Sequence, residues 1–212
     1  MDTMIQEIYE AIIDGDMERV KDGVNAALSG GKAPGVILSE GMIAAMAEVG
    51  KRFEKGDFFV PEMLVSARAM KNGLEILRPM LAKSGVQAVG KVAIGTVKGD
   101  LHDIGKNLVS MMLEGAGFEI NDLGVDVSPE KFVEVVKDNK PNIVALSALL
   151  TTTMQNMKAT IEAIEAAGLR NEVKIMIGGA PVTQEYANQI GADGYSSDAS
   201  RAVSVAKSLM VK

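Results

Sequence analysis

In the first 84 positions, hydrophobic residues recur every three or four residues, which is the spacing of helices that bury one face. We expect four helices that open at capping residues or prolines: about 2–14, a helix from Asp16, a helix from Pro34 that stops at Gly56, and a helix from Pro61. Short links between helices are typical of a small bundle. The first half is therefore predicted to be a four-helix bundle.

Beyond residue 90 the pattern changes to short apolar runs, each followed by a helical pattern. The expected strands are 92–97, 118–123, 143–146, 173–177 and a weaker 194–195, and the helices are about 105–116, 128–139, 153–167, 183–190 and 198–210. Such alternation predicts a parallel sheet with helices on both faces. The fold class is thus α/β: a helical bundle at 1–84, a linker at 85–90 and a flavodoxin-like, doubly wound, five-stranded domain at 91–212.

Composition narrows the possible functions. The 212 residues carry a net charge of −6 and include one histidine and no cysteine. This acidic balance argues against nucleic acid, which is bound through Lys and Arg, and without cysteine there is no disulfide or thiolate metal site. The N-terminus begins as an acidic amphipathic helix, and no stretch approaches the ~20 apolar residues of a membrane span. We therefore expect a cytoplasmic protein that binds neither nucleic acid nor membranes.

Candidate chemistry gathers in the loops that follow the predicted strands. In doubly wound folds, ligands bind beyond the carboxyl ends of the strands, where the strand order reverses. The first of these loops, 95–107, holds His102 between Asp100 and Asp103. The other loops are 147–153, 178–181 and 196–200.

The His102 loop can be compared with several known kinds of binding or catalytic site. A P-loop is excluded because five residues rather than four separate Gly99 from Gly105, and no Ser or Thr follows the lysine. A zinc site needs three or four ligands, usually His or Cys, and this chain has one His and no Cys. A hydrolase that pairs Ser110 or Ser147 with His102 is conceivable, although no GxSxG motif supports it.

A macrocyclic metal cofactor needs only one histidine, because its ring already supplies four nitrogens. His102 could be the axial ligand, and Asp100 could accept a hydrogen bond from the other imidazole nitrogen. In the alternative interpretation His102 is a solvated residue, Asp100 and Asp103 cap the next helix, and the glycine pair 178–179 is a tight turn. Spacing alone favours this alternative.

Three motifs follow one another at the expected strand ends: Asp100-x-His102-x-x-Gly105, Ser147-x-Leu149 and Gly178-Gly179. Together they resemble the cobalamin-binding module of methionine synthase and of corrinoid methyltransferase proteins. The similarity is close around GTVKGDLHDIGKN and extends to GGAPVT and GADGYSSDA. Residues 48–70 resemble the helical cap of the same family, so the resemblance covers nearly the whole chain.

The resemblance implies a cobalamin, carried as methylcobalamin in the loaded state, with His102 as the lower axial ligand of cobalt in place of the cofactor's own base. Asp100 would hold the far nitrogen of His102, and Thr153 occupies the position of a hydroxyl that continues this relay, which is Ser in the methionine synthases. These three are the implied catalytic residues. The other implied cofactor-binding residues surround His102, line the slot for the nucleotide tail or cap the methyl-bearing face: Gly99, Leu101, Asp103, Ile104, Gly105; Ser147, Leu149, Thr151, Gly178, Gly179, Ala180, Gly194, Tyr195; Phe53 and Val60.

Phe53 and Val60 are equally explained by ordinary helix packing, and both explanations can hold. The resemblance also implies a cap that swings aside on a hinge at residues 83–90.

The implied function is that of a corrinoid methyl carrier in one-carbon metabolism. Its partners would be a donor-specific methyltransferase, a methyltransferase with a folate or thiol acceptor, and a reductive activator of cobalt(II). The alternatives are a cobalamin-dependent sensor, which usually carries a basic DNA-binding helix that this acidic N-terminal half lacks, a mutase subunit, and a phospho-receiver with Asp100 or Asp103 as acceptor.

Overall fold

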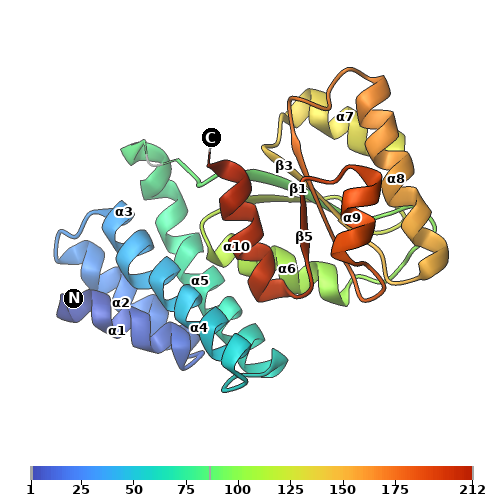
Figure 1. Cartoon of the computed structure of the whole chain (residues 1–212). Coiled ribbons are helices and arrows are strands. Elements are labelled where there is room, and N and C mark those ends of the chain that lie inside the picture. Colours follow the sequence, from blue (N-terminus) through green and yellow to red (C-terminus); the bar gives the residue numbers. More distant parts are fainter. Residues whose placement is uncertain (1, 86, 212) are drawn as a thin grey trace. The chain divides into compact units, whose positions relative to one another are not determined.

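The computed structural model describes residues 2–85 and 87–211, which form two compact units (Figure 1). One unit comprises Met1–Ala88 with Glu114–Gly117, and the other comprises Val89–Leu113 with Phe118–Lys212. The predicted linker 85–90 includes Val86, which lies outside the described residues. The exact domain boundaries therefore stay a prediction.

The first unit is helical, and its helices begin where the sequence supplies caps. Its elements are α1 (Thr3–Ile13), α2 (Met17–Ser29), α3 (Pro34–Val36), the π-helical segment η1 (Ile37–Ile43), α4 (Ala44–Lys55) and α5 (Val60–Ser84). The carboxylate of Asp2 accepts the Met4 N–H, and that of Asp16 accepts the Arg19 N–H, each at 3.1 Å. Such bonds satisfy amides that the helix leaves without intrahelical partners. Apolar side chains of all the longer helices form the core: Ile5, Ile8, Ile12, Val20, Val24, Met46, Val49, Met63, Met70 and Leu77.

The predicted third helix differs from expectation in its middle. The chain is helical from Pro34 to Lys55, but seven of its residues, Ile37–Ile43, are π-helical. A Cβ added at Gly41 would lie 3.4 Å from Ile5 Cγ2, so this wide turn packs close to α1. Because Ile37 and Met42 are buried in either geometry, the hydrophobic spacing did not reveal the π segment.

The second unit confirms the predicted fold class. Its elements alternate: β1 (Lys91–Thr96), α6 (Ile104–Gly115), β2 (Glu119–Asp122), α7 (Pro129–Asn139), β3 (Ile143–Ser147), α8 (Thr151–Ala166), β4 (Lys174–Gly178), α9 (Gln184–Ile190), β5 (Gly194–Ser196) and α10 (Ala199–Met210). All strand pairs are parallel, and the strand order is β2-β1-β3-β4-β5. This is the flavodoxin-like order.

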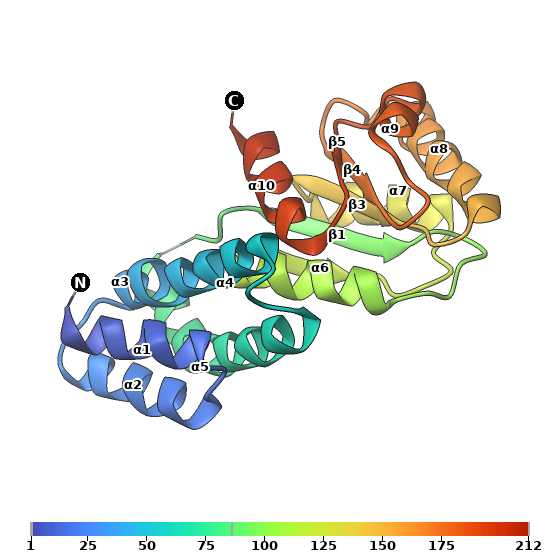
Figure 2. The same ribbon diagram turned by 60° about the horizontal axis from the view of Figure 1, so that its bottom comes forward.

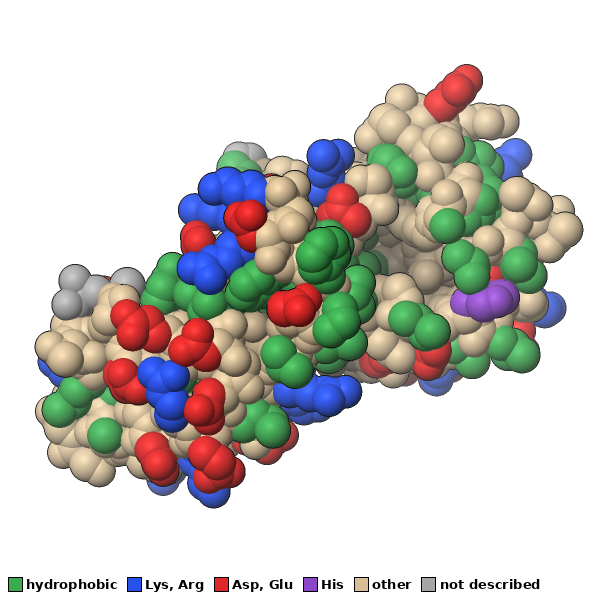
Figure 3. Space-filling model, turned by 90° about the horizontal axis from the view of Figure 1, so that it is seen from below, with side chains coloured by type: hydrophobic (Ala, Val, Ile, Leu, Met, Phe, Trp, Pro, Cys, Tyr) green, Lys and Arg blue, Asp and Glu red, His purple; other side chains and the backbone are tan. Residues whose placement is uncertain are grey.

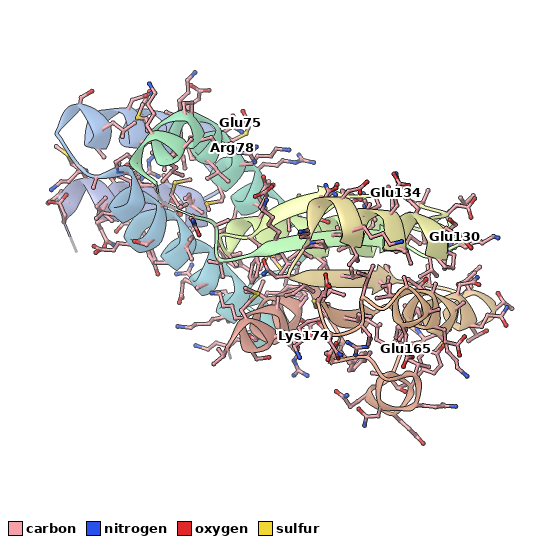
Figure 4. The ribbon with its side chains drawn as sticks, turned by 90° about the horizontal axis from the view of Figure 1, so that it is seen from above. Glu75, Arg78, Glu130, Glu134, Glu165 and Lys174 are labelled. Atoms are coloured by element: carbon pink, nitrogen blue, oxygen red, sulfur yellow. The ribbon has the colours of Figure 1, made fainter. Side chains whose placement is uncertain are left out.

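Helices cover both faces of this sheet. Buried residues of α7, α8 and α9 form one core with the strands, including Phe132, Met157 and Ile161 against Val144 and Ile175. Figures 1 and 2 place α6 and α10 on the opposite face. The outer sides of the helices are charged: Figure 4 labels Glu130 and Glu134 of α7 and Glu165 of α8 among the exposed side chains.

The strand order determines where loops meet. From β1 the chain crosses to β2 on one side, and β3 lies on the other side of β1, with Thr96 in register with Ser147. The crevice between β1 and β3 is therefore the switch point at which such folds bind ligands. The loops that follow these two strands hold His102 and Thr153. Among the described residues, the longest apolar stretches of helix fall short of what a membrane crossing requires.

Candidate functional site

His102 lies in the loop between the end of β1 and the start of α6. The Thr96 hydroxyl donates to the His102 carbonyl at 2.8 Å, which fastens the loop to the last residue of β1. The imidazole is 50% exposed, and Figure 3 shows this single histidine, in purple, at the molecular surface. A ligand arriving at the carboxyl end of the sheet can therefore reach the ring.

Asp100 is fully buried beneath His102 and joins two loops. Its carboxylate Oδ1 accepts the His102 backbone N–H at 3.0 Å and lies 2.7 Å from His102 Nδ1. Its Oδ2 receives three bonds from the start of α8: the N–H groups of Leu149 and Leu150 at 2.8 and 3.3 Å, and the Thr153 hydroxyl at 2.7 Å. One carboxylate therefore holds the imidazole on one side and the β3–α8 loop on the other.

The charge on Asp100 follows from these contacts. Burial is the largest single influence and raises the pKa of the carboxyl, but hydrogen bonds from Thr153, the Leu149 N–H and His102 together outweigh it and hold the pKa well below its usual range. The partial positive charge at the N-terminus of α8 acts in the same direction. Asp100 is therefore a carboxylate at neutral pH.

An ionised carboxylate can only accept hydrogen bonds, so it decides which imidazole nitrogen carries the proton. In neutral His102, Nδ1 must be the N–H that faces Asp100 Oδ1. The lone pair then belongs to Nε2, in a side chain that is half exposed. This is the arrangement that a histidine ligand of a metal requires.

Thr153 is buried and has two acceptors within reach of its one hydroxyl proton. Its Oγ lies 2.7 Å from Asp100 Oδ2 and 2.9 Å from the Leu150 carbonyl oxygen. While Asp100 is ionised, the proton points to the carboxylate. If Asp100 were protonated, the hydroxyl could turn to Leu150 and accept from Asp100 instead.

Exposed apolar side chains surround His102. Leu101 and Ile104 are 72% and 81% exposed, and Leu149 and Leu150, from the facing loop, are each 42% exposed. Green hydrophobic side chains lie beside the purple histidine in Figure 3. A large, flat and partly apolar ligand would cover this surface, as a single metal ion would not.

Several residues predicted to line the nucleotide slot lie on neighbouring strands: Ser147 and Gly178 end β3 and β4, whereas Gly194 and Tyr195 belong to the short strand β5. Ser147 pairs with Gly178, and Met176 pairs with Gly194. A Cβ added at Gly179, whose φ is +134°, would lie 1.9 Å from the Ala148 carbonyl oxygen. This glycine is thus required by the close approach of two backbones.

Gly194 has a similar packing reason, because a Cβ there would meet Val205 Cγ1 of α10 at 2.7 Å. The small residues of this region are therefore explained at least in part by protein contacts, whereas the sequence argument assigned them to the slot. Leu149, Thr151 and Ala180 are exposed, and Tyr195 is half-buried. Their part in binding stays a prediction.

The remaining predicted residues are divided between the two units. Gly99, Asp103 and Gly105 are exposed around His102. The Asp103 carbonyl accepts the Asn107 N–H, and its carboxylate accepts the Asn107 side chain. Phe53 is half-buried on α4, and Val60 is 40% exposed at the first position of α5. Their role above a cofactor likewise stays a prediction.

Sequence reasoning missed several residues that hold the loop. Besides Thr96, the Asn156 side chain donates to the Lys98 carbonyl at 2.7 Å, and Asp126 Oδ1 accepts the Gly99 N–H at 2.7 Å. Asn156 lies one helical turn after Thr153, a spacing that would have pointed to the same site. Asp126 follows another strand, and its position in the sequence carried no such signal.

The comparisons with known proteins agree with this geometry. A B12 binding domain family matches residues 90–204, and a second B12 binding domain family matches residues 4–78. The trimethylamine corrinoid protein of Methanosarcina barkeri is 45% identical over 98% of this chain and 96% of its own, and the dimethylamine corrinoid protein 1 of Methanosarcina mazei is 44% identical over 98% and 96%. In the solved methanol:cobalamin methyltransferase complex of Methanosarcina barkeri, a chain superposes with a TM-score of 0.87 at 31% identity, over 99% of this chain and 80% of that one.

The described residues fit the cofactor that these families bind. His102 presents a nitrogen lone pair from a half-exposed ring, and apolar side chains of two loops surround it. The predicted resemblance and cofactor class are therefore confirmed. Since the matches extend over both units, the chain belongs to the family of corrinoid proteins with B12-binding domains.

Proposed function

We propose that this protein is the methyl carrier of a methylamine-type methyltransferase system and that His102 is the lower axial ligand of its corrinoid. The observation that carries the proposal is the half-exposed imidazole whose Nδ1 is held by buried Asp100, which directs the Nε2 lone pair to the ligand. The bound corrinoid would supply a cobalt that accepts and releases a methyl group.

The donor class is inferred from the relatives. The two corrinoid proteins reported above, named for trimethylamine and dimethylamine, are 45% and 44% identical to this chain, whereas the methanol system is 31% identical. We therefore place a methylated amine and its donor-specific methyltransferase first. A second methyltransferase with a folate or thiol acceptor and a reductive activator complete the proposed set of partners.

The residues around His102 have separate tasks in this proposal. Asp100 keeps Nδ1 protonated and orients the ring, and the imidazole becomes a stronger ligand because its far proton is held by an anion. Thr153 can stabilise Asp100 in either protonation state, since its hydroxyl donates to the carboxylate and can turn to the Leu150 carbonyl when Asp100 carries a proton. Full burial of Asp100 also argues against Asp100 as a phospho-acceptor, which has to be accessible, but it does not bear on the exposed Asp103.

Reconstitution tests the ligand. The apoprotein and the His102→Ala variant are loaded with a corrinoid that lacks the nucleotide base, so that the cofactor cannot supply the axial nitrogen itself, and are then reduced to cobalt(II) and compared by EPR and visible absorption. Nitrogen hyperfine splitting from the axial ligand is expected in the unaltered protein and is expected to be absent in the variant. Lys98→Ala, an exposed side chain of the same loop, is the matched control. Splitting that persists without His102 would rule out the ligand role.

A second assay tests the donor. The loaded protein is incubated either with a purified trimethylamine or dimethylamine methyltransferase and the matching amine, or with a methanol methyltransferase and methanol, and methylation is followed by visible absorption. Transfer from an amine but not from methanol supports the proposed donor class. Transfer from methanol alone would overturn it while leaving the carrier role intact.

A further inference from the structure

The segment Asp122–Val127, which begins at the last residue of β2, contacts the His102 loop at both ends of the loop. At the near end, Asp126 Oδ1 accepts the Gly99 N–H at 2.7 Å, and the Asp126 N–H donates to the Asp100 carbonyl at 3.0 Å. In addition, the Val127 N–H donates to the Thr96 carbonyl at 3.0 Å. These bonds fix the backbone directly before the Asp100–His102 pair.

At the far end, a buried lysine pairs with an aspartate whose side chain is 39% exposed. The Lys106 side chain is 2% exposed, and its ammonium lies 2.5 Å from Asp122 Oδ2 and 2.7 Å from Asn107 Oδ1. Lys106 belongs to the first turn of α6, directly after the His102 loop. A lysine is rarely buried unless it is paired, so Asp122 determines where this turn of helix lies.

The backbone of Asp126 adopts an unusual conformation that its contacts with the loop hold in place. Its φ is 53°, a left-handed conformation that residues other than glycine seldom adopt. Aspartate tolerates this conformation better than most residues, and here the strained geometry is coupled to two hydrogen bonds with the loop. Gly99, the partner of the Asp126 side chain, is also left-handed, with φ of 80°.

We infer that Asp126 and the Lys106–Asp122 pair are positioning residues that hold the His102 loop in its ligating conformation before the cofactor binds. They act through the backbone on either side of His102. The inference rests on the proposed ligand role of His102, but the contacts that Asp126 and the Lys106–Asp122 pair make with the loop are a property of the apoprotein.

Three variants of the full chain separate the contributions of Asp126 and the ion pair. Asp126→Gly keeps the left-handed backbone and removes the acceptor. Asp126→Asn keeps both the tolerance for that backbone and an acceptor oxygen. The double variant Lys106→Met, Asp122→Asn removes the ion pair without leaving a buried charge.

Amide hydrogen exchange on the apoprotein, read by NMR, is the first measurement. In Asp126→Gly the Gly99 amide is expected to exchange about tenfold faster, as expected when one hydrogen bond is lost, and Asp126→Asn is expected to restore it to within about twofold. The double variant is expected to accelerate the Asn107 amide by a similar factor. Unchanged exchange at Gly99 in Asp126→Gly would overturn the inference.

The second measurement is the share of nitrogen-ligated cobalt in the EPR spectrum after loading with a corrinoid that lacks the nucleotide base and reduction to cobalt(II). We expect this share to fall in Asp126→Gly and to recover in Asp126→Asn, whereas a merely structural role would lower the unfolding midpoint without changing the spectrum. Equal shares in the two variants would overturn the inference. If the unaltered protein shows no nitrogen splitting, the proposed function fails. The exchange experiment still decides whether Asp126 and the Lys106–Asp122 pair hold the His102 loop.

Discussion

Replacing Asp100 with Asn alters one atom of the site and should move a proton on His102. The side chain keeps its shape, but one carboxylate oxygen becomes an NH2 group that donates. Oδ2 accepts three bonds from the start of α8, so the amide oxygen is expected to take that side and to turn the NH2 group toward His102. Nδ1 then has to accept, and the imidazole proton moves to Nε2.

The size of the effect follows from the contacts that are lost. A hydrogen bond to a charged group is worth about 1.5–3 kcal/mol, so the 2.7 Å contact from Nδ1 to Oδ1 favours the Nδ1–H form by roughly tenfold to a hundredfold. The variant loses this contact and the bond from the His102 backbone N–H, and its bonds on the other side weaken. We expect a loss of about 3 kcal/mol in the free energy of unfolding.

The chain has a single histidine, so one imidazole gives all the signals in a long-range ¹H–¹⁵N NMR spectrum. At about pH 8 the ring of an ordinary histidine is neutral, and the two nitrogens report which of them is protonated. The apoprotein is expected to show protonated Nδ1, and Asp100→Asn protonated Nε2. Urea unfolding of both proteins measures the change in stability.

Asp103→Asn is the matched control, because that carboxylate flanks His102 on the other side and accepts from the Asn107 side chain. It should leave the tautomer as it is. A spectrum of the unaltered protein with the proton on Nε2 would refute the assignment of the ligand nitrogen. An unchanged tautomer in Asp100→Asn would refute the claim that Asp100 controls it.

Three further outcomes are expected. Gly179→Ala would place Cβ 1.9 Å from the Ala148 carbonyl oxygen. This variant should lower the free energy of unfolding by at least about 2 kcal/mol in urea titrations, and it should retain less hydroxocobalamin on gel filtration. Thr153→Val should cost about 1–2 kcal/mol in the same titrations because it removes a donor to Asp100, and Thr153→Ser should recover most of that loss. The pKa of Asp100 is lowered in the folded protein, so the stabilisation that its carboxylate gives the fold is complete above about pH 4 and declines as the pH falls further. The difference in free energy of unfolding between the unaltered protein and Asp100→Asn, measured by urea unfolding at several pH values, should therefore narrow in that acid range.

The architecture was predictable because each strand carries its own signal. Runs such as Val92–Val97 are largely apolar, as strands buried on both faces are, and helical patterns between them leave few topologies. Asp100 and His102 were predictable as a pair because they are two residues apart in one loop. The neighbouring loop was expected to contribute Thr153 and does, at 2.7 Å from Asp100.

The rest of the site depends on backbone groups and on turns without a side-chain pattern. The Leu149 and Leu150 N–H groups bind Asp100, and any residue except proline would present the same donors in their place. Asp126 accepts the Gly99 N–H from a backbone with positive φ, and a single aspartate in a loop does not predict that conformation. The π-helical turn at Ile37–Ile43 was missed for a similar reason, since its buried residues suit an α-helix equally well.

Lys106 shows how one residue type supports different sites. In the sequence, Gly105-Lys106 suggested a phosphate loop, and the spacing of the glycines excluded it. In the structure the ammonium is buried and paired with Asp122, so its charge is already compensated within the protein. A phosphate-binding lysine has to keep its ammonium free for the ligand, whereas the Lys106 side chain is 2% exposed and its ammonium is held by Asp122. The lysine that resembles a ligand-binding group is therefore better explained as part of the support for the histidine loop.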